Sequence, residues 1–275
     1  GEGDVEWVVP FGGPFPDTGL AVTSGRMGGA FVTGSFAGTV LFGTNSLTSR
    51  GSADAFVVRL GGTPCNDTSR FRRRCGCTGA VEWAVQLGGP AADLGYGIAS
   101  SDERREVGSG DEEDVFITGS FAGTAVFGAT SLTGSGNGHD AYVARLGGRS
   151  GKLKWAVRMG GPLDDFGYGI ACAGAQGMLV TGSFAGYVKF GATTLLSAEH
   201  RDAFVAFVSG SSVVEWAARL GGPFDDAGHS VAYDQAGRVL VAGSFQVNGL
   251  FGGILVKGSG GNDAFVTQLQ YPELS

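Results

Sequence analysis

Eight aspartates recur at matching places along the chain and are the residues best suited to chemistry. Four follow a G-G-P turn: Asp17, Asp93, Asp165 and Asp226. Four more open a D-A-[FY]-V motif: Asp54, Asp140, Asp202 and Asp263. Gathered on one face, such carboxylates would supply the roughly six to eight oxygen ligands that calcium takes. An Asp side chain also bonds the backbone amides of its own turn, and we favour this turn-capping interpretation over calcium at the four G-G-P aspartates.

The sequence offers no other catalytic arrangement. A G-S-F tripeptide recurs at Gly34, Gly119, Gly182 and Gly243. A nucleophile elbow needs G-x-S-x-G on a strand-to-helix turn, whereas here Ser follows Gly directly. The three histidines, His139, His200 and His229, do not occupy matching places, and no phosphate loop or dinucleotide fingerprint appears. We therefore predict a protein that is not an enzyme and that has no cofactor.

One tryptophan begins each copy of the motif series: Trp7, Trp83, Trp155 and Trp216. If these rings were exposed on one rim, they could bind sugar. Burial of a large side chain contributes about 1.5–3 kcal/mol, so we favour wedges between repeated units.

The cysteines and one sequon point to an oxidising compartment. Cys65, Cys75 and Cys77 crowd one segment, where a disulfide from Cys65 to Cys75 or Cys77 would close a short loop. Cys172 lies in an apolar stretch and is expected to be a buried small hydrophobe. Asn66 begins an N-glycosylation sequon beside Cys65. Together these features predict a secreted glycoprotein, extracellular or on the cell surface.

The spacing of the motifs predicts the elements that carry them. In the third copy we expect strands at 154–159, 168–172, 178–184 and 202–208, separated by glycine-rich turns. No segment has a sustained helical period, and the interval from the third copy to the fourth is the same at all three markers. Four strands per unit, written four times, predict an all-β fold, a four-bladed β-propeller of four-stranded blades.

The two ends of the chain predict how the ring closes. The chain begins with a Trp strand at 5–11 and ends after the D-A-F-V strand at 263–270, which has no Trp strand behind it. Joining the N-terminal strand to the last blade would remove an open sheet edge. We therefore predict a single domain over residues 1–275. Insertions at 62–79 and 101–114 map to surface loops, where we expect any recognition feature that is specific to this chain.

Composition excludes several classes of protein. The chain has 275 residues, 52 of them glycine, with a net charge of −7 and a pI of about 4.9. This acidic balance argues against nucleic-acid binding. No apolar run approaches the roughly 20 residues of a membrane-spanning helix. No signal peptide is recognisable, and the start at Gly1 is that of a mature form or a segment.

The repeated pattern resembles the SBBP-type β-propeller repeats found in many surface and secreted proteins. The resemblance lies in G-G-x-x-x-D-x-G, V-x-V-x-G-S-F and D-A-F-V, which the fourth copy carries at 221–228, 239–245 and 263–266. It covers nearly the whole chain, while an F-x-G-x-x-x-F-G hairpin and the Cys-Arg loop depart from the usual pattern. It implies a non-enzymatic extracellular structural or adhesion module that assembles with itself or belongs to a larger surface protein. The alternative is a carbohydrate- or calcium-dependent binding module, with a glycan or a protein as partner.

Overall fold

The protein is all-β. The computed structural model describes residues 3–5, 7–25, 29–62, 77–101, 113–174, 177–234 and 237–270, which form nineteen strands and no helix. Within these residues no helix has the length and apolar character needed to cross a membrane.

The strands divide into four units that follow the four copies of the sequence motifs. Unit 1 comprises β1 (Thr18–Ser24), β2 (Ala30–Phe36), β3 (Thr39–Phe42), β4 (Asn45–Thr48), β5 (Asp54–Gly62) and β6 (Cys77–Gly88). Unit 2 comprises β7 (Leu94–Ser100), β8 (Asp114–Ala122), β9 (Thr124–Phe127), β10 (Thr130–Thr133), β11 (His139–Gly147) and β12 (Leu153–Met159). Unit 3 comprises β13 (Phe166–Cys172), β14 (Gly177–Phe190), β15 (Thr193–Ser209) and β16 (Val214–Leu220). Unit 4 comprises β17 (Ala227–Tyr233), β18 (Arg238–Phe251) and β19 (Ile254–Gln270).

Each of units 1 to 3 is an antiparallel sheet whose outer strand comes from the next copy of the motif. The orders are β1-β2-β5-β6, β7-β8-β11-β12 and β13-β14-β15-β16, and the Trp strands β6, β12 and β16 pair with β5, β11 and β15. The first sheet continues through β6 into the β9-β10 hairpin of unit 2. This sharing of strands joins each unit to its successor.

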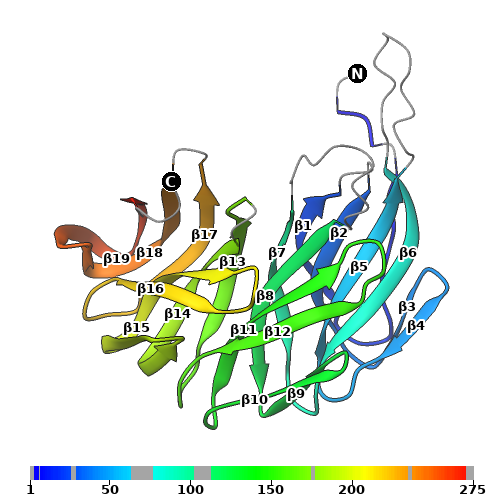
Figure 1. Ribbon diagram of the computed structural model, residues 1–275, viewed down its shortest axis with the longest axis horizontal. Helices are drawn as coiled ribbons and strands as arrows, with labels where there is room; N and C mark the ends of the chain where they lie inside the picture. The colour runs from blue at the N-terminus through cyan, green and yellow to red at the C-terminus, as the bar shows by residue number, and fades with distance from the viewer. Residues whose placement is uncertain are drawn as a thin grey trace.

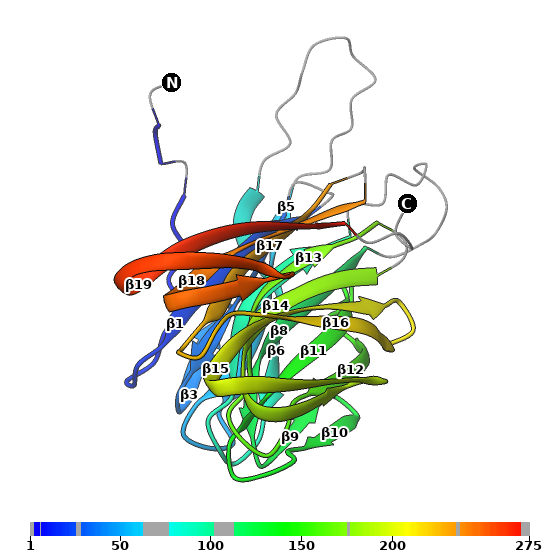
Figure 2. The ribbon, with the colours of Figure 1, turned by 90° about the vertical axis from the view of Figure 1, so that its left-hand side faces the viewer.

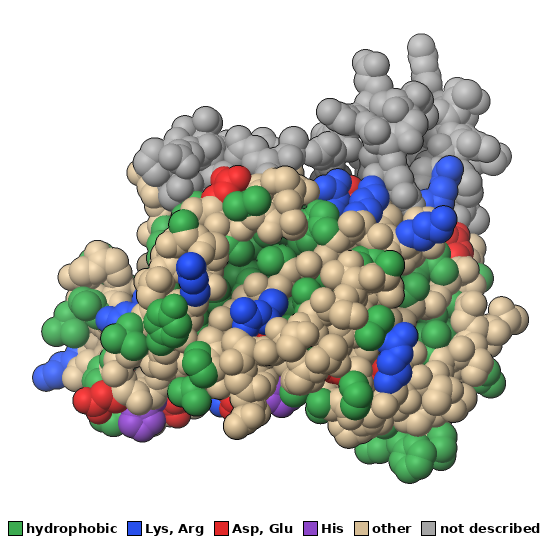
Figure 3. Space-filling view, turned by 60° about the horizontal axis from the view of Figure 1, so that its bottom comes forward, with side chains coloured by type: hydrophobic (Ala, Val, Ile, Leu, Met, Phe, Trp, Pro, Cys, Tyr) green, Lys and Arg blue, Asp and Glu red, His purple; other side chains and the backbone are tan. Residues whose placement is uncertain are grey.

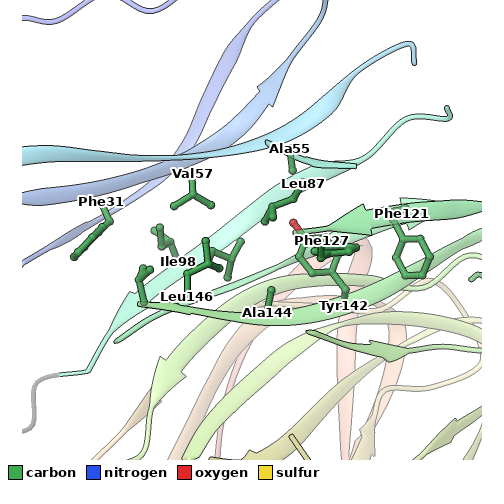
Figure 4. Packing of buried hydrophobic residues seen from close by; sticks show 13 residues of the cluster. Phe31, Ala55, Val57, Leu87, Ile98, Phe121, Phe127, Tyr142, Ala144 and Leu146 are labelled. Carbon is green, nitrogen blue, oxygen red and sulfur yellow. The ribbon is translucent and has the colours of Figure 1, made fainter. Parts of the chain in front are cut away.

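The inner strands lie in succession, β1 beside β7, β7 beside β13, and β13 beside β17 (Figure 1). Between neighbouring units lies a seam filled with apolar side chains. In the first seam, Phe31 and Val57 of unit 1 face Ile98 and Leu146 of unit 2 (Figure 4). Trp83, Trp155 and Trp216 pack in the first, second and third seams, as wedges between units should.

The predicted closure of the ring is not observed. Unit 4 has three strands, β17-β18-β19, and no described residue pairs with the outer edge of β19. The fan of sheets stays open between the first and last units (Figures 1 and 2). The all-β prediction is confirmed, but the sheets do not close into a four-bladed propeller.

The N-terminal segment packs against its own unit instead of unit 4. The Phe11 ring lies 5.3 Å from that of Phe42, and Gly12 bridges Leu41. Trp7 and Val9 lie against Gly79 of β6. Side-chain packing across each seam fixes the angle between two sheets, and three such angles leave units 1 and 4 apart. A count of strands in the sequence carries no information on these angles.

Candidate functional site

Each G-G-P aspartate caps its own turn. Asp93 Oδ2 accepts a hydrogen bond from the Gly89 amide at 2.6 Å, and its Oδ1 accepts one from the Ala122 amide at 3.2 Å. Asp17, Asp165 and Asp226 accept the same two bonds in their own units. The carboxylate thus ties the turn before the inner strand to the residue after the G-S-F motif.

The seams bring these aspartates together with the D-A-[FY]-V aspartates of the preceding unit. The Asp93 backbone amide donates to the Ala53 carbonyl at 2.9 Å, which places Asp93 beside Asp54. A methyl group at Gly88 would lie 2.7 Å from Asp54 Cγ and 2.8 Å from Asp93 Oδ2, so the glycine lies between the two carboxyl groups. Gly160 and Gly221 lie in the same way between the pairs Asp140–Asp165 and Asp202–Asp226. We call these three arrangements the seam pairs.

Burial raises the pKa of a carboxyl group in each seam pair. The pKa of Asp93 rises to about 7 because burial removes its hydration, although its two backbone donors lower it, and the nearby Asp54 carboxylate raises it further. The same causes bring the pKa of Asp165 to about 7, with Asp140 as the neighbouring carboxylate. In the third pair, burial raises the pKa of Asp202 to about 6 and also raises that of Asp226. Between about pH 4 and these raised pKa values, each pair therefore keeps a proton that a free aspartate would release.

A proton shared by two carboxyl groups is also the feature of an acid–base active site, and raised pKa values gather at such sites. Here the space between the groups is filled by the backbone of Gly88, Gly160 or Gly221, which leaves no place for a substrate. The arrangement also recurs at three seams. The chemistry that fits it is protonation linked to the contact between units.

The structure does not assemble the eight aspartates into one ring of ligands. They form separate pairs along the fan, and among the described residues no group of three or more His, Cys, Asp or Glu side chains could hold a metal ion. Asp17 and Asp263, at the two ends, have no seam partner. The calcium prediction gains no support from this geometry.

The sequence did not reveal the arginine and glutamine side chains that contact the seam pairs. Arg158 contacts Asp140 at 3.0 Å and Arg219 contacts Asp202 at 3.1 Å, while the Gln86 amide donates to Asp54. All three lie three residues after the Trp of their strand, a spacing that could have been noticed. Pro10 occupies the same place after Trp7, so the N-terminal segment lacks this polar partner.

A second group of residues lines the inner strands. Each inner strand carries a β-bulge that skips one residue in the pairing, at Leu20, Tyr96, Tyr168 and His229. The rings of Tyr96 and Tyr168 lie 5.3 Å apart, and those of Tyr168 and His229 lie 5.9 Å apart. Bulges re-aim side chains and are frequent next to functional sites. We call Tyr96, Phe166, Tyr168 and His229 the inner lane.

An arginine and a histidine flank the inner lane at Phe166. The Arg201 guanidinium lies 5.0 Å from the centre of the Phe166 ring, and the His139 ring stacks on it at 5.6 Å. Phe166 in turn stacks on Tyr168 at 5.8 Å, with an angle of 6° between the rings. A row of aromatic faces with polar groups at its edge fits a flat, hydroxyl-rich ligand such as a sugar.

An open hollow of about 410 Å³ lies beside the end of the unit 3 hairpin. Leu163, Leu196, His200, Arg201 and Asp225 line it. Arg201 pairs with Asp164 at 2.6 Å, and the His200 ring stacks on Phe224 at 5.9 Å. On the face seen in Figure 3, the charged side chains of the described residues are scattered among neutral ones.

Several predicted sites lie outside the residues that the structure describes. Cys65, Cys75 and Asn66 lie outside the described residues, and Cys77 is described only as the first residue of β6. The insertions at 62–79 and 101–114 lie mostly outside them as well. Cys172 is partly buried in the second seam, with its Sγ 3.2 Å from the Ser100 carbonyl oxygen.

No model of a protein family matches the sequence, and no curated protein is significantly similar to it. The class that the structure supports is a β-sheet repeat protein whose carboxylate pairs lie in the seams between units.

Proposed function

We propose that this protein is a non-enzymatic extracellular structural or adhesion module of the SBBP-repeat kind, built to present surfaces on a rigid β-scaffold. The observation that carries the proposal is the placement of the seam-pair carboxyl groups. The seam pairs, Asp54–Asp93, Asp140–Asp165 and Asp202–Asp226, enclose glycine backbone and not a cleft. Sites that recur at every seam hold the units together, whereas a catalytic site needs one open place for a substrate.

The closed four-bladed propeller predicted from the sequence stays a prediction. In that form the segment at 5–11 would become the fourth strand of unit 4, as β6, β12 and β16 are the fourth strands of units 1 to 3. The glycoprotein and disulfide predictions at Asn66 and Cys65 belong to the same proposal, because both require a secreted chain.

Location tests the proposed role. Antibodies raised against the chain should label intact, unpermeabilised cells that produce it, and the protein should shift in mass on treatment with an N-glycosidase. An Asn66→Gln variant should lose that mass shift and keep its surface labelling. Labelling that appears only after permeabilisation would contradict an extracellular module.

The inner lane favours a second function, carbohydrate binding. Tyr168 offers a half-buried ring flanked by Tyr96, Phe166 and His229. Loss of one stacking ring costs about 1.4 kcal/mol, which is about tenfold in affinity. On a panel of soluble plant, fungal and N-linked oligosaccharides, Tyr168→Ala should bind about tenfold more weakly. Tyr187→Ala, at an exposed tyrosine of the unit 3 hairpin, should bind like the unaltered protein. Equal binding by the two variants would remove the inner lane as the site.

A further inference from the structure

The outer edge of unit 4 lacks the strand that every other unit has. The strands β5, β11 and β15 each pair on both sides, whereas β19 pairs only with β18 among the described residues. An unpaired edge presents free amide and carbonyl groups to another strand.

In units 1 to 3, one face of the sheet packs against the next unit, and we call it the forward face. The forward face of unit 4 is exposed. At the last position of the D-A-[FY]-V motif, Val57, Val143 and Val205 are fully buried in seams, while Val266 is 75% exposed. Ala264 is exposed too, whereas its counterparts Ala55, Ala141 and Ala203 are buried. Unit 4 therefore carries a seam face with nothing packed on it.

The complementary face is exposed on unit 1. Val22, on inner strand β1, is 68% exposed, while its register counterparts Ile98 and Val231 are buried in the first and third seams. Val32 is only partly buried, whereas Ile117, Val180 and Val241 at the same register position are fully buried. Units 1 and 4 thus expose the two halves of one seam.

The N-terminal segment already has the position of a seam strand relative to its own unit. Gly12 bridges Leu41 of the unit 1 hairpin, just as Gly160 bridges Lys189 and Gly221 bridges Leu250. Trp7 lies against Gly79 of β6 as Trp83 lies against Gly151 before β12. The segment lacks only the D-A-[FY]-V strand of a preceding unit as a pairing partner. The strand β19 carries this motif, and its outer edge is unpaired among the described residues.

We infer that a second copy of this chain completes the seam, with its segment at 5–11 added as the fourth strand of β19. In the register of β5 with β6, Val9 lies opposite Val266 and Trp7 opposite Gln268. The second copy is favoured over closure within one chain because closure would have to rotate three packed seams, and close-packed interiors resist such movement. The contact is head-to-tail, so it generates a larger ring or a filament.

This inference deepens the proposed scaffold role, and it names the partner. The seam it forms would also bring Asp17 beside Asp263, with Gly12 between them in the place of Gly88. A methyl group at Gly12 meets only Asp17 Oδ2, at 3.5 Å, within one chain. In the completed seam the same methyl group would collide with both carboxyl groups.

Cysteine pairing tests the inference directly. The variants Val9→Cys and Val266→Cys are prepared separately, then mixed and oxidised gently. Residues directly opposite on two antiparallel strands can be joined by a disulfide. We expect a disulfide-linked species of twice the chain mass only in the mixture, and neither variant should form it alone. Val8→Cys mixed with Val266→Cys, one residue out of register, should link at least about tenfold less.

Light scattering on size-exclusion fractions supplies the second readout. The unaltered chain should exceed its 27.9 kDa mass, increasingly so at higher concentration. The variants Val266→Asp and Gly12→Ala should remain at the single-chain mass with unchanged circular dichroism. The control variant Val213→Asp changes an exposed valine between β15 and β16 and should assemble like the unaltered chain. Two results would overturn the inference in favour of a monomer. One is a mass of 27.9 kDa for the unaltered chain at every concentration. The other is an intramolecular disulfide in the Val9→Cys/Val266→Cys double variant. Surface location would be unaffected, so the two proposals fail independently.

Discussion

Replacing Gly88 by alanine should lower the free energy of unfolding by about 3 kcal/mol or more. The added carbon would meet Asp54 Cγ at 2.7 Å and Asp93 Oδ2 at 2.8 Å. Neither carboxyl group can move aside cheaply, because Asp93 is held by the Gly89 and Ala122 amides and Asp54 by Gln86. Urea unfolding followed by circular dichroism measures the loss.

Gly12→Ala is the matched control, since Gly12 is the same residue of the same motif without a preceding unit. Its nearest neighbour would be 3.5 Å away, so the change in stability should stay within about 0.5 kcal/mol. Both variants are compared in the Val266→Asp background, where assembly contributes nothing. If Gly88→Ala does not fold, the double variant Gly88→Ala/Asp54→Ala restores room for the methyl group and should recover stability relative to it. Equal losses at Gly12 and Gly88 would refute the seam-pair geometry.

The sequence predicted the elements of the fold because their signals are local. The G-G-P-x-x-D-x-G turns, the apolar strand before each G-S-F and the D-A-[FY]-V strand were each recognisable within about ten residues. The capping role preferred for Asp93 also needs only a turn, and the Gly89 amide lies four residues before it. Short-range chemistry of this kind is legible without coordinates.

The candidate sites were less predictable because they join residues from different units. Asp54 and Asp93 meet only across a seam, so a sequence without known contacts gives no reason to pair them. Leu20, Tyr96, Tyr168 and His229 share a bulge position, but this position holds three residue types in four units, so the sequence did not reveal the match. Ring closure, which the structure does not show, depends on the angle at each seam, because four units form a circle only if these angles add up to a full turn. The packing of side chains such as Phe31 against Ile98 sets that angle.

The protein should become less stable as pH rises from about 4 to about 7, the reverse of ordinary acid denaturation. In the folded state the pKa values of Asp93 and Asp165 are about 7 and that of Asp202 is about 6, while an unfolded Asp has a value near 3.9. Between these limits the folded chain binds more protons than the unfolded chain, and the free energy of unfolding therefore falls with rising pH. The stabilisation is complete below about pH 4 and is lost as pH passes through the folded pKa values. The total fall should be on the order of a few kcal/mol.

Urea unfolding at pH 4.5, 5.5, 6.5 and 7.5 measures this slope, again in the Val266→Asp background. Asp165→Asn replaces a titrating group by a neutral one of the same shape, so the slope should become shallower. Thr118→Val is the control without a titrating group: it removes the 2.8 Å hydrogen bond from the Thr118 hydroxyl to the Tyr142 carbonyl in the second seam. That variant should lower the whole curve by about 1 kcal/mol and leave its slope unchanged. Stability that rises between pH 4.5 and 7.5 would mean that the seam pairs are ionised when folded, and that Arg158 and Arg219 outweigh burial at these carboxylates.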